Sequence, residues 1–337
     1  LTYDDEFSFN IEVTLNQSGF PYYTTNEIHT SPIVSDLNSD GQNEIIFGDH
    51  FGEIRAIDKN GNETLTNIFP YDTGDQIWGS PVLGDIDLDG NSDIIFVSKS
   101  GGLYVFDRYG LKWSYETDSK LIGTPSIANI NESSELELVV SGYSNNQDNF
   151  YIFSSEGLLI DQIDIFEKIK SGFSLADVNG NGIDDIVFGT DDDNLYLVHD
   201  GNDIAQGYPF QAPDKFILKP TIIKHPDVTG EDTFLIIAPC KNKIVYGLDS
   251  NGEIEFETEF NQNISTSSSV LMNQNQMMIF IGFDNGDIYW FDTLGNSSFF
   301  KNINSEVVGE IIFADLDLDL VPEIIAVNDI GEAHVLN

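Results

Sequence analysis

Short acidic loops recur along this chain, and each places oxygen-bearing side chains at alternate positions around a tight turn. The second loop contains, in order, Asp85, Asp87, Asp89, Gly90, Asn91 and Asp93. Calcium takes about six to eight oxygen ligands, and a glycine lets a short loop bend around the ion. We expect ligands from the side chains at the first, third, fifth and ninth positions and from the backbone carbonyl at the seventh. The loop therefore predicts a calcium site.

Three other loops carry related ligand sets. These are Asp36, Asn38, Asp40, Gln42 and Glu44 in the first loop, Asp177, Asn179, Asn181, Ile183 and Asp185 in the fourth, and Asp315, Asp317, Asp319, Val321 and Glu323 in the seventh. The seventh loop has Leu320 in place of the glycine, and a side chain there costs energy if the turn needs a positive φ. One such loop alone could be a solvated turn, but the recurrence of the loop in several repeats favours metal binding.

The remaining loops are poorer in carboxylates. The third, from Asn129 to Glu137, should bind weakly or not at all, and the fifth and sixth, near His225 and Asn273, should be empty. The sequence thus predicts about three or four structural calcium ions, which would contribute directly to stability.

The loops belong to a longer repeat. Residues 31–36 lead into the first loop, an apolar run follows at 44–49, another at 52–58, and a turn at 59–61. Seven such units follow one another at spacings of 43 to 49 residues. Each unit holds three short β-branched or aromatic runs and a weaker fourth, which indicates a four-stranded antiparallel sheet. The expected fold is all-β, a seven-bladed β-propeller.

The two ends of the chain bear on ring closure. The last unit stops after its third apolar run at 333–337, while residues 17–22 resemble the start of a fourth strand at 206–210. We therefore expect residues 17–337 to form one propeller domain whose last blade is closed by an N-terminal strand. Residues 1–16 would be a further strand or a linker. The chain begins at Leu1 without a signal segment, so it is expected to be a mature protein or a fragment.

The amino-acid composition limits the classes of binding partner. A formal net charge of -43, from 57 acidic and 14 basic residues, would repel nucleic acid and anionic lipid and attract divalent cations. No apolar run is long enough to span a membrane. The single cysteine, Cys240, follows an apolar run and is expected to be a buried structural thiol.

With these motifs the chain resembles FG-GAP or VCBS repeats, which form the propellers of integrin α-subunits and of many bacterial secreted surface proteins. Besides the acidic loops, the resemblance rests on Phe47-Gly48, Phe188-Gly189 and the Gly-Phe-Pro sequence at 19–21. The family implies that the metal loops join the first two strands of each blade on one face. It also implies that partners dock on the opposite face, without membrane insertion.

The resemblance therefore implies an extracellular or cell-surface module that binds a protein or carbohydrate ligand without catalysis. Aligning the blades brings His29, Trp78 and Lys170 to equivalent places near the central funnel, with His50 beside them. Trp78 could stack on a sugar, anchor a peptide or simply plug the funnel. About half of the basic residues fall on this face.

Two alternatives remain open. A polysaccharide lyase-like enzyme could use His29, His50 and Lys170, although Arg55 and Arg108 are the only arginines that could clamp a carboxylate. An architectural subunit of a surface assembly would instead use blade edges, neighbouring domains or self-association. One deep pocket that unites the four candidate residues would favour the enzyme, and a shallow face would favour the binding module.

Overall fold

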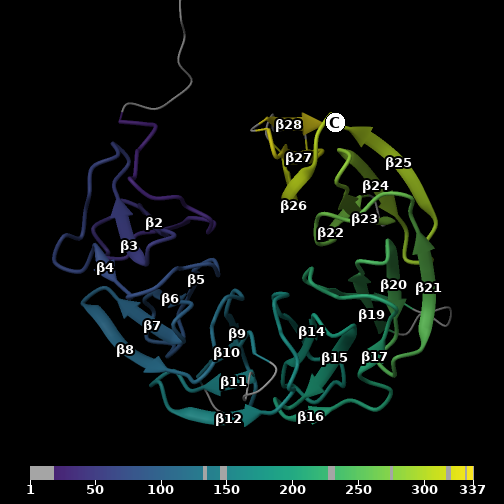
Figure 1. Ribbon diagram of the computed structural model, residues 1–337, viewed down its shortest axis with the longest axis horizontal. Coiled ribbons are helices and arrows are strands. Elements are labelled where there is room, and N and C mark those ends of the chain that lie inside the picture. Colours follow the sequence, from purple (N-terminus) through teal and green to yellow (C-terminus); the bar gives the residue numbers. More distant parts are fainter. Residues whose placement is uncertain are drawn as a thin grey trace, which may run out of the picture.

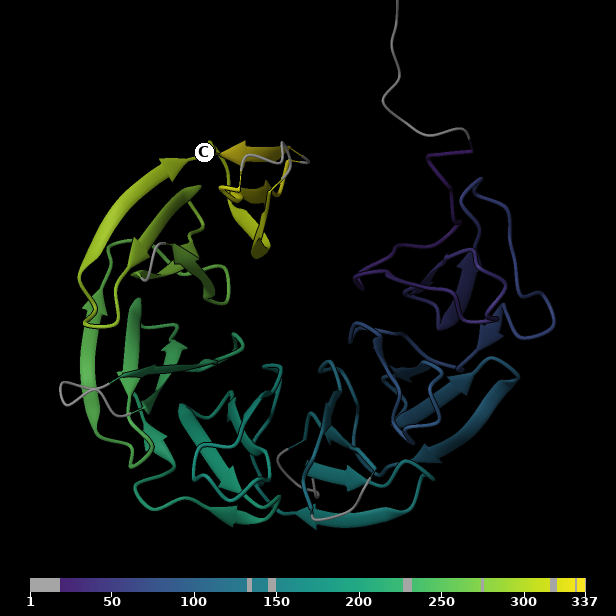
Figure 2. The same ribbon diagram turned by 180° about the vertical axis from the view of Figure 1, so that it is seen from behind.

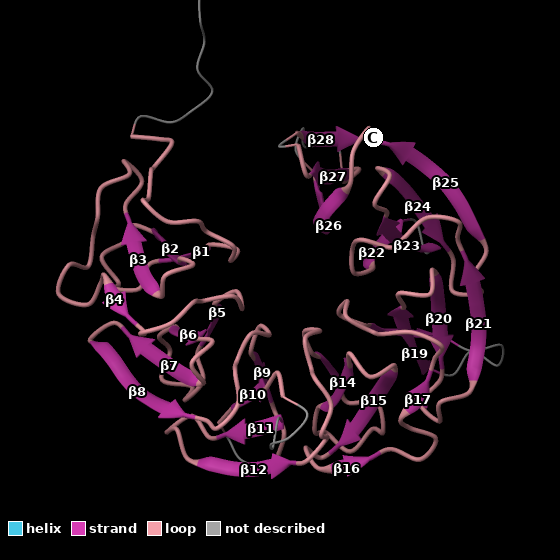
Figure 3. Cartoon of the chain, in the orientation of Figure 1, coloured by secondary structure: helices cyan, strands magenta, loops and turns pink. Residues whose placement is uncertain are grey.

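A computed structural model describes residues 19–131, 135–144, 150–226, 232–273, 276–315, 320–330 and 332–336. These residues form seven antiparallel sheets and contain no helix (Figure 3). The sheets follow one another around a central axis, with the first strand of each on the inner side and the last at the rim (Figures 1 and 2). The expected seven-bladed propeller is confirmed.

The strands of the first four blades follow the repeat. They are β1 (Ile33–Ser35), β2 (Glu44–Gly48), β3 (Glu53–Ile57) and β4 (Tyr71–Asp72) in blade 1; β5 (Val82–Gly84), β6 (Asp93–Val97), β7 (Gly102–Asp107) and β8 (Gly110–Glu116) in blade 2; β9 (Ser126–Ala128), β10 (Glu137–Ser141), β11 (Phe150–Phe153) and β12 (Leu159–Ile163) in blade 3; and β13 (Ser174–Ala176), β14 (Asp185–Gly189), β15 (Asn194–His199), β16 (Asp203–Ile204) and β17 (Phe210–Gln211) in blade 4.

The last three blades vary more. Their strands are β18 (Thr221–Pro226), β19 (Asp232–Pro239), β20 (Ile244–Leu248) and β21 (Ile254–Glu259) in blade 5; β22 (Ser269–Asn273), β23 (Gln276–Gly282), β24 (Asp287–Phe291) and β25 (Ser297–Asn302) in blade 6; and β26 (Val307–Ala314), β27 (Glu323–Asn328) and β28 (Ala333–Leu336) in blade 7.

Burial explains the two kinds of strand sequence. The second strands, such as β6 and β14, are buried along their whole length because a neighbouring blade covers each face. Their sequences are accordingly continuous apolar runs. Rim strands such as β21 alternate between exposed and buried residues, since one of their faces meets water. The apolar pattern thus fixes where each strand lies in its blade.

The core is divided among the interfaces between blades. Six apolar clusters join consecutive blades from the first to the seventh. Between blades 3 and 4, for example, Phe188 stacks on Phe150 and Tyr196 with ring centroids 5.3 and 5.2 Å apart. No cluster among the described residues joins blade 7 to blade 1, where Val34 and Val335 are exposed.

The N-terminal segment packs as its resemblance to residues 206–210 predicts. Gly207, before the rim strand β17 of blade 4, lies against the Asn251 carbonyl in the β20–β21 turn of blade 5. Gly19 lies in the same way against the Asn60 carbonyl after β3 of blade 1. Gly19 therefore has the position of a rim segment of blade 7. Residues 17–22 were expected to begin the strand that closes blade 7. Among the described residues, however, β28 pairs with β27 alone and residues 19–32 form no strand, so this closure is not seen there. Residues 1–18 lie outside the described residues.

We predict that Gly207→Ala destabilises the propeller much more than Gly74→Ala. Both glycines have a positive φ, which costs an alanine about 1–2 kcal/mol, but only at Gly207 would the new Cβ lie 1.8 Å from a backbone oxygen. The clash should add about 1–3 kcal/mol to the loss of unfolding free energy. Chemical denaturation of both variants checks this, and equal losses would contradict the packing of Gly207.

We also predict that Cys240 is unreactive in the folded protein. Its thiol is 1% exposed, donates to the Asp214 carbonyl, and has its pKa raised to about 11 by burial. At pH 8 the thiolate would then be only about 0.1% of the total. A thiol reagent such as dithionitrobenzoate should label the chain only after unfolding. Rapid stoichiometric labelling of native protein would refute a buried thiol.

Candidate functional site

The first, second and fourth acidic loops fold by one hydrogen-bond pattern. Each connects the first strand of its blade to the second, so all three lie on the same face. The first aspartate of each loop accepts amide hydrogens from the fifth and sixth residues, and the ninth residue accepts the amide of the second. The Asp, Asn and Gly positions that defined the motif are thus also the residues that shape the turn.

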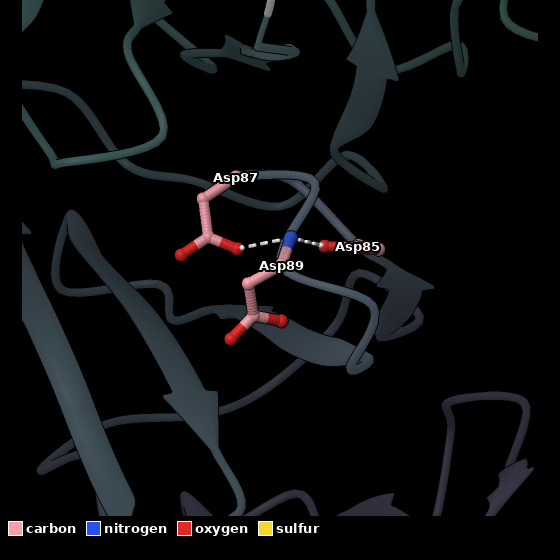
Figure 4. Close-up of side chains that lie close together, drawn as sticks. All are labelled: Asp85, Asp87 and Asp89. Atoms are coloured by element: carbon pink, nitrogen blue, oxygen red, sulfur yellow. Dashed lines mark hydrogen bonds between the residues drawn. The ribbon is translucent and has the colours of Figure 1, made fainter.

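Loop 2 shows the arrangement in detail (Figure 4). The amide of Asp89 donates to Asp85 Oδ1 at 2.9 Å and to Asp87 Oδ1 at 3.3 Å. Each of the three aspartates offers one oxygen within 4.8 Å of the others, so the three could hold one cation. Among the described residues this is the acidic cluster that meets that distance. Asn91, at the seventh position, donates its amide to Asp89 Oδ1 at 2.8 Å.

The ninth position is a buried carboxylate in every one of these loops. Glu44, Asp93 and Asp185 are 3%, 3% and 0% exposed, and each accepts the amide of the loop's second residue. Burial of a carboxylate is costly unless a cation or several donors compensate it. The groups around the ninth residue therefore indicate how far its charge is compensated without a metal ion.

Loop 2 already contains a cationic side chain. Lys112, on the rim strand β8, places its Nζ 2.7 Å from Asp87 Oδ2 and 3.2 Å from Asp93 Oδ1. Burial opposes the charge of Lys112, but its hydrogen bonds to the two aspartates raise its pKa. The pKa of Asp93 is raised by burial, and Lys112 offsets part of that effect. The ammonium thus neutralises the third- and ninth-position carboxylates.

Loop 4 holds an imidazole in the corresponding place. His199 Nδ1 lies 2.8 Å from Asp185 Oδ1 and 3.3 Å from the amide nitrogen of Asn179. The ninth-position carboxylate of loop 4 thus has an imidazole as its internal partner, where that of loop 2 has an ammonium.

Loop 1 has no cationic side chain in contact with its acidic ligands, within the described part of the chain. Burial raises the pKa of Glu44, and the negative charges of Asp40 and Asp36 raise it further. Its described hydrogen bond is from the Leu37 amide at 3.1 Å. The oxygen donors and the uncompensated buried carboxylate fit a calcium ion, which Asp36, Asn38, Asp40, Glu44 and the Gln42 carbonyl would hold.

Loop 7 bends as the other loops do. Asp315 Oδ2 accepts the amide of Leu320 at 3.0 Å, and Leu320 has a φ of 71° where the other loops have glycines near 85–89°. The expectation that this leucine occupies a glycine-type turn is confirmed. Glu323 is buried at the ninth position, beside Val321 at the seventh. Asp317 and Asp319 lie outside the described residues.

The opposite face brings together three of the four candidate ligand residues. The rings of His29 and His50 have centroids 4.7 Å apart, and those of His50 and Trp78 are 5.9 Å apart. Gln76 and Lys99 complete the group, since the Gln76 amide contacts His50, Trp78 and Lys99. Sequence reasoning missed Gln76, because an isolated glutamine carries no signature. Lys170 is exposed and makes no described contact with this group.

The central channel is a separate feature. A cavity of about 920 Å³ is lined by the start of the first strands of several blades, and none of His29, His50, Trp78 or Lys170 lines it. Its wall carries a belt of hydroxyl groups that join blades. Ser80 Oγ accepts the Ser31 amide, Thr124 Oγ1 the Ser80 amide, and Ser267 Oγ the Lys219 amide. The repeated Ser-Pro and Thr-Pro sequences were the signal for this belt.

The fold and the loops define the class of protein: a seven-bladed β-propeller with acidic turns on one face. Residues 36–124 match the family described as an FG-GAP-like repeat, so the resemblance is confirmed over those residues. No curated protein sequence matches the chain. Among the described residues, no helix is long and apolar enough to cross a membrane.

Solved structures support the fold. The chain is similar to BBS1N, solved in complex with ARL6DN, with 12% identity and a TM-score of 0.63 over 94% of this chain and 93% of that one. Sqt1 of Saccharomyces cerevisiae gives 13% identity and a TM-score of 0.63 over 89% and 82%. The Dos1 propeller gives 14% and 0.62 over 92% and 82%. At these identities the likeness shows the fold alone.

We predict that Lys112→Met strengthens calcium binding at loop 2 about tenfold, because the ion no longer has to displace an ammonium; tenfold corresponds to about 1.4 kcal/mol. In chelator the same variant should lose about 1–2 kcal/mol of stability, since Asp93 stays buried without its partner. Calorimetric titration and chemical denaturation measure the two effects. Lys301→Met, on the exposed strand β25, makes the same charge change as a control. Unchanged calcium affinity in Lys112→Met would refute the competition.

Proposed function

We propose that the chain is an extracellular, calcium-stabilised propeller that acts as a non-catalytic binding module for a protein or carbohydrate ligand. The observation that carries the proposal is the repeated loop pattern that ends in a buried carboxylate, with no cationic partner described at Glu44. A divalent cation is the partner that such a site lacks.

The extracellular location follows from the proposed metal. Loops of this kind are filled reliably where calcium is abundant, and millimolar calcium is found outside cells. Without the ion, loop 1 would hold the carboxylates of Asp36, Asp40 and Glu44 with no described internal cation, and the negative charges of Asp40 and Asp36 raise the pKa of Glu44. Calcium would thus hold blade 1 together, and its role would be structural.

The binding role is supported by the division between the two faces. The proposed metal loops lie on one face. The opposite face, where Trp78 is 42% exposed beside His29 and His50, remains available for a ligand. Exposed aromatic groups with adjacent polar groups are typical anchor points of interfaces. BBS1N, a propeller of similar fold, was solved in complex with ARL6DN.

An enzymatic role has less support. The lyase-like alternative requires His29, His50 and Lys170 to converge in one deep pocket, but Lys170 stands apart and none of the three lines the channel. Arg55 is held by Glu53 and Glu63, and Arg108 donates to Asn91 on the metal-loop side. Neither arginine reaches the candidate face, so a bidentate clamp for a substrate carboxylate is lacking there.

We predict that calcium raises the melting temperature by about 5 °C or more relative to chelator, because each site filled to a hundredfold excess over its Kd adds about 2.7 kcal/mol. Titration should show about three or four sites. Glu44→Gln should remove one of them and reduce the shift in melting temperature.

Asp58→Asn is the matched control for Glu44→Gln. Asp58 also accepts amides two and four residues ahead, but it does so in the β3–β4 turn and is not one of the expected ligands of loop 1. It should leave calcium binding unchanged. If calcium neither binds nor shifts the melting temperature of the parent protein, the acidic loops are only solvated turns and the proposed function loses its main support.

A further inference from the structure

Seven equivalent residue pairs mark the face opposite the metal loops. In each blade a residue of the turn between the second and third strands donates its amide to a carbonyl in the segment before the first strand, at 2.7–3.0 Å. It is the second residue after the second strand in blades 1 to 6 and the first in blade 7. We call these the rim pairs, a name that refers to this face of the propeller and not to the outer rim strands of the blades. In blade order they are Glu27/His50, Gln76/Lys99, Lys120/Tyr143, Lys168/Asp191, Lys215/Lys241, Asn263/Asp284 and Glu306/Asp329. Because the backbone contact is the same in each, their side chains form one ring around the face.

Charge is segregated around this ring. The rim pairs of blades 2 to 5 hold five lysines and one aspartate, whereas those of blades 6, 7 and 1 hold two aspartates, two glutamates and no lysine or arginine. Blades 2 to 5 run in sequence from β5 to β21 in the lower half of Figure 1, and the acidic pairs belong to the blades at both ends of the arc. We call the five lysines the lysine arc. These are five of the chain's 14 basic residues, and they lie beside carboxylates such as Asp118, Asp192 and Asp214 in the same segments.

The lysines of the arc are poorly neutralised by the protein itself. Elsewhere the basic side chains near carboxylates pair tightly, as Arg55 does with Glu63 at 2.6 Å and Lys112 with Asp87 at 2.7 Å. In the arc, Lys215 lies 3.6 Å from Asp191 Oδ2. No described carboxylate lies within ion-pair distance of the other four arc lysines, although the chain has 57 acidic residues.

Two of these lysines are held in place by aromatic rings. Lys99 Nζ lies 5.0 Å from the centre of the Trp78 ring and donates to Gln76 Oε1 at 2.6 Å. Lys168 Nζ lies 5.2 Å from the centre of the Tyr143 ring, and Tyr143 donates to Asp191. A cation over an aromatic face is held without losing its charge. The ammonium groups are therefore positioned, yet still able to attract an anion.

We propose that the lysine arc is a docking surface for a short acidic segment of a partner protein, which lies across blades 2 to 5. This inference rests on the proposed binding role of the same face and specifies its ligand. The segment would place Asp and Glu side chains against Lys99, Lys120, Lys168 and Lys241. Lysines make single-point contacts without fixed orientation, so they suit carboxylates at irregular spacing.

One observation favours a short peptide over a long anionic polysaccharide or nucleic acid. The arc ends at acidic rim pairs on both sides, so a long uniform polyanion would extend onto repelling surface. A short acidic segment can lie within the arc.

Fluorescence anisotropy with labelled octaglutamate, and octaglutamine as the uncharged reference, tests the proposal in calcium-loaded full chain. We expect octaglutamate alone to bind, with affinity that falls as salt rises. Lys120→Gln/Lys241→Gln removes two exposed arc lysines with no described side-chain partner and should weaken binding about tenfold. Lys59→Gln/Lys301→Gln makes the same charge change outside the arc and should leave binding nearly unchanged.

Carbodiimide cross-linking of bound octaglutamate, followed by mass spectrometry, should give links to arc lysines. Equal binding of the two peptides, equal losses in both double variants, or links elsewhere would overturn the proposal. Binding of polygalacturonate without octaglutamate would replace the peptide by a glycan. The calcium shift in melting temperature is measured on the same samples, so failure of the arc and failure of the calcium-dependent module can be told apart.

Discussion

The structure depends on one constraint: the second strands of the blades are apolar on both faces. A strand such as β6 or β14 has no face that can meet water, so a neighbouring sheet must cover each side. Seven sheets that satisfy this in turn are arranged around an axis, and their core is divided into clusters between blades. Because neighbouring strands run in opposite directions, every loop lies on one of two opposite faces. The acidic loops and the rim pairs lie on different faces for this reason alone.

The sequence was sufficient for the fold because its signals are local and repeated. Apolar runs, Asp/Asn/Gly turns and their spacing recur in each blade, so an ambiguity in one repeat is resolved by the next. The geometry of loops 1, 2 and 4 could be predicted because the residues that would bind the ion also form the turn, as Asp36 and Asp177 do. The likeness of residues 17–22 to 206–210 also reflected packing, since Gly19 and Gly207 make the same contact.

What the sequence could not supply were contacts between side chains distant along the chain. Loop 2 looks like the best metal site by motif, yet Lys112 reaches it from β8, and a single lysine on an alternating strand has no signature. Blade alignment placed His29 and Trp78 correctly, but it could not show that Gln76 links His50 to Trp78. It grouped Lys170 with them because backbone equivalence was taken as contact, and the side chain makes none that is described.

The few basic side chains of this acidic protein compensate only some of its buried carboxylates. A carboxylate buried at the ninth position of a loop needs a counterion, and the chain meets this need in different ways. Lys112 is a tethered counterion of Asp93 in the absence of a metal ion, whereas no such side chain accompanies Glu44 among the described residues. Without calcium, blade 1 would therefore hold an uncompensated carboxylate, while Asp93 of blade 2 would have Lys112 as its partner. Five further lysines belong to the rim pairs on the opposite face, where Lys215 alone lies within ion-pair distance of a described carboxylate, Asp191. The same scarcity of cations that leaves Glu44 without a described cationic partner thus makes the lysine arc distinctive.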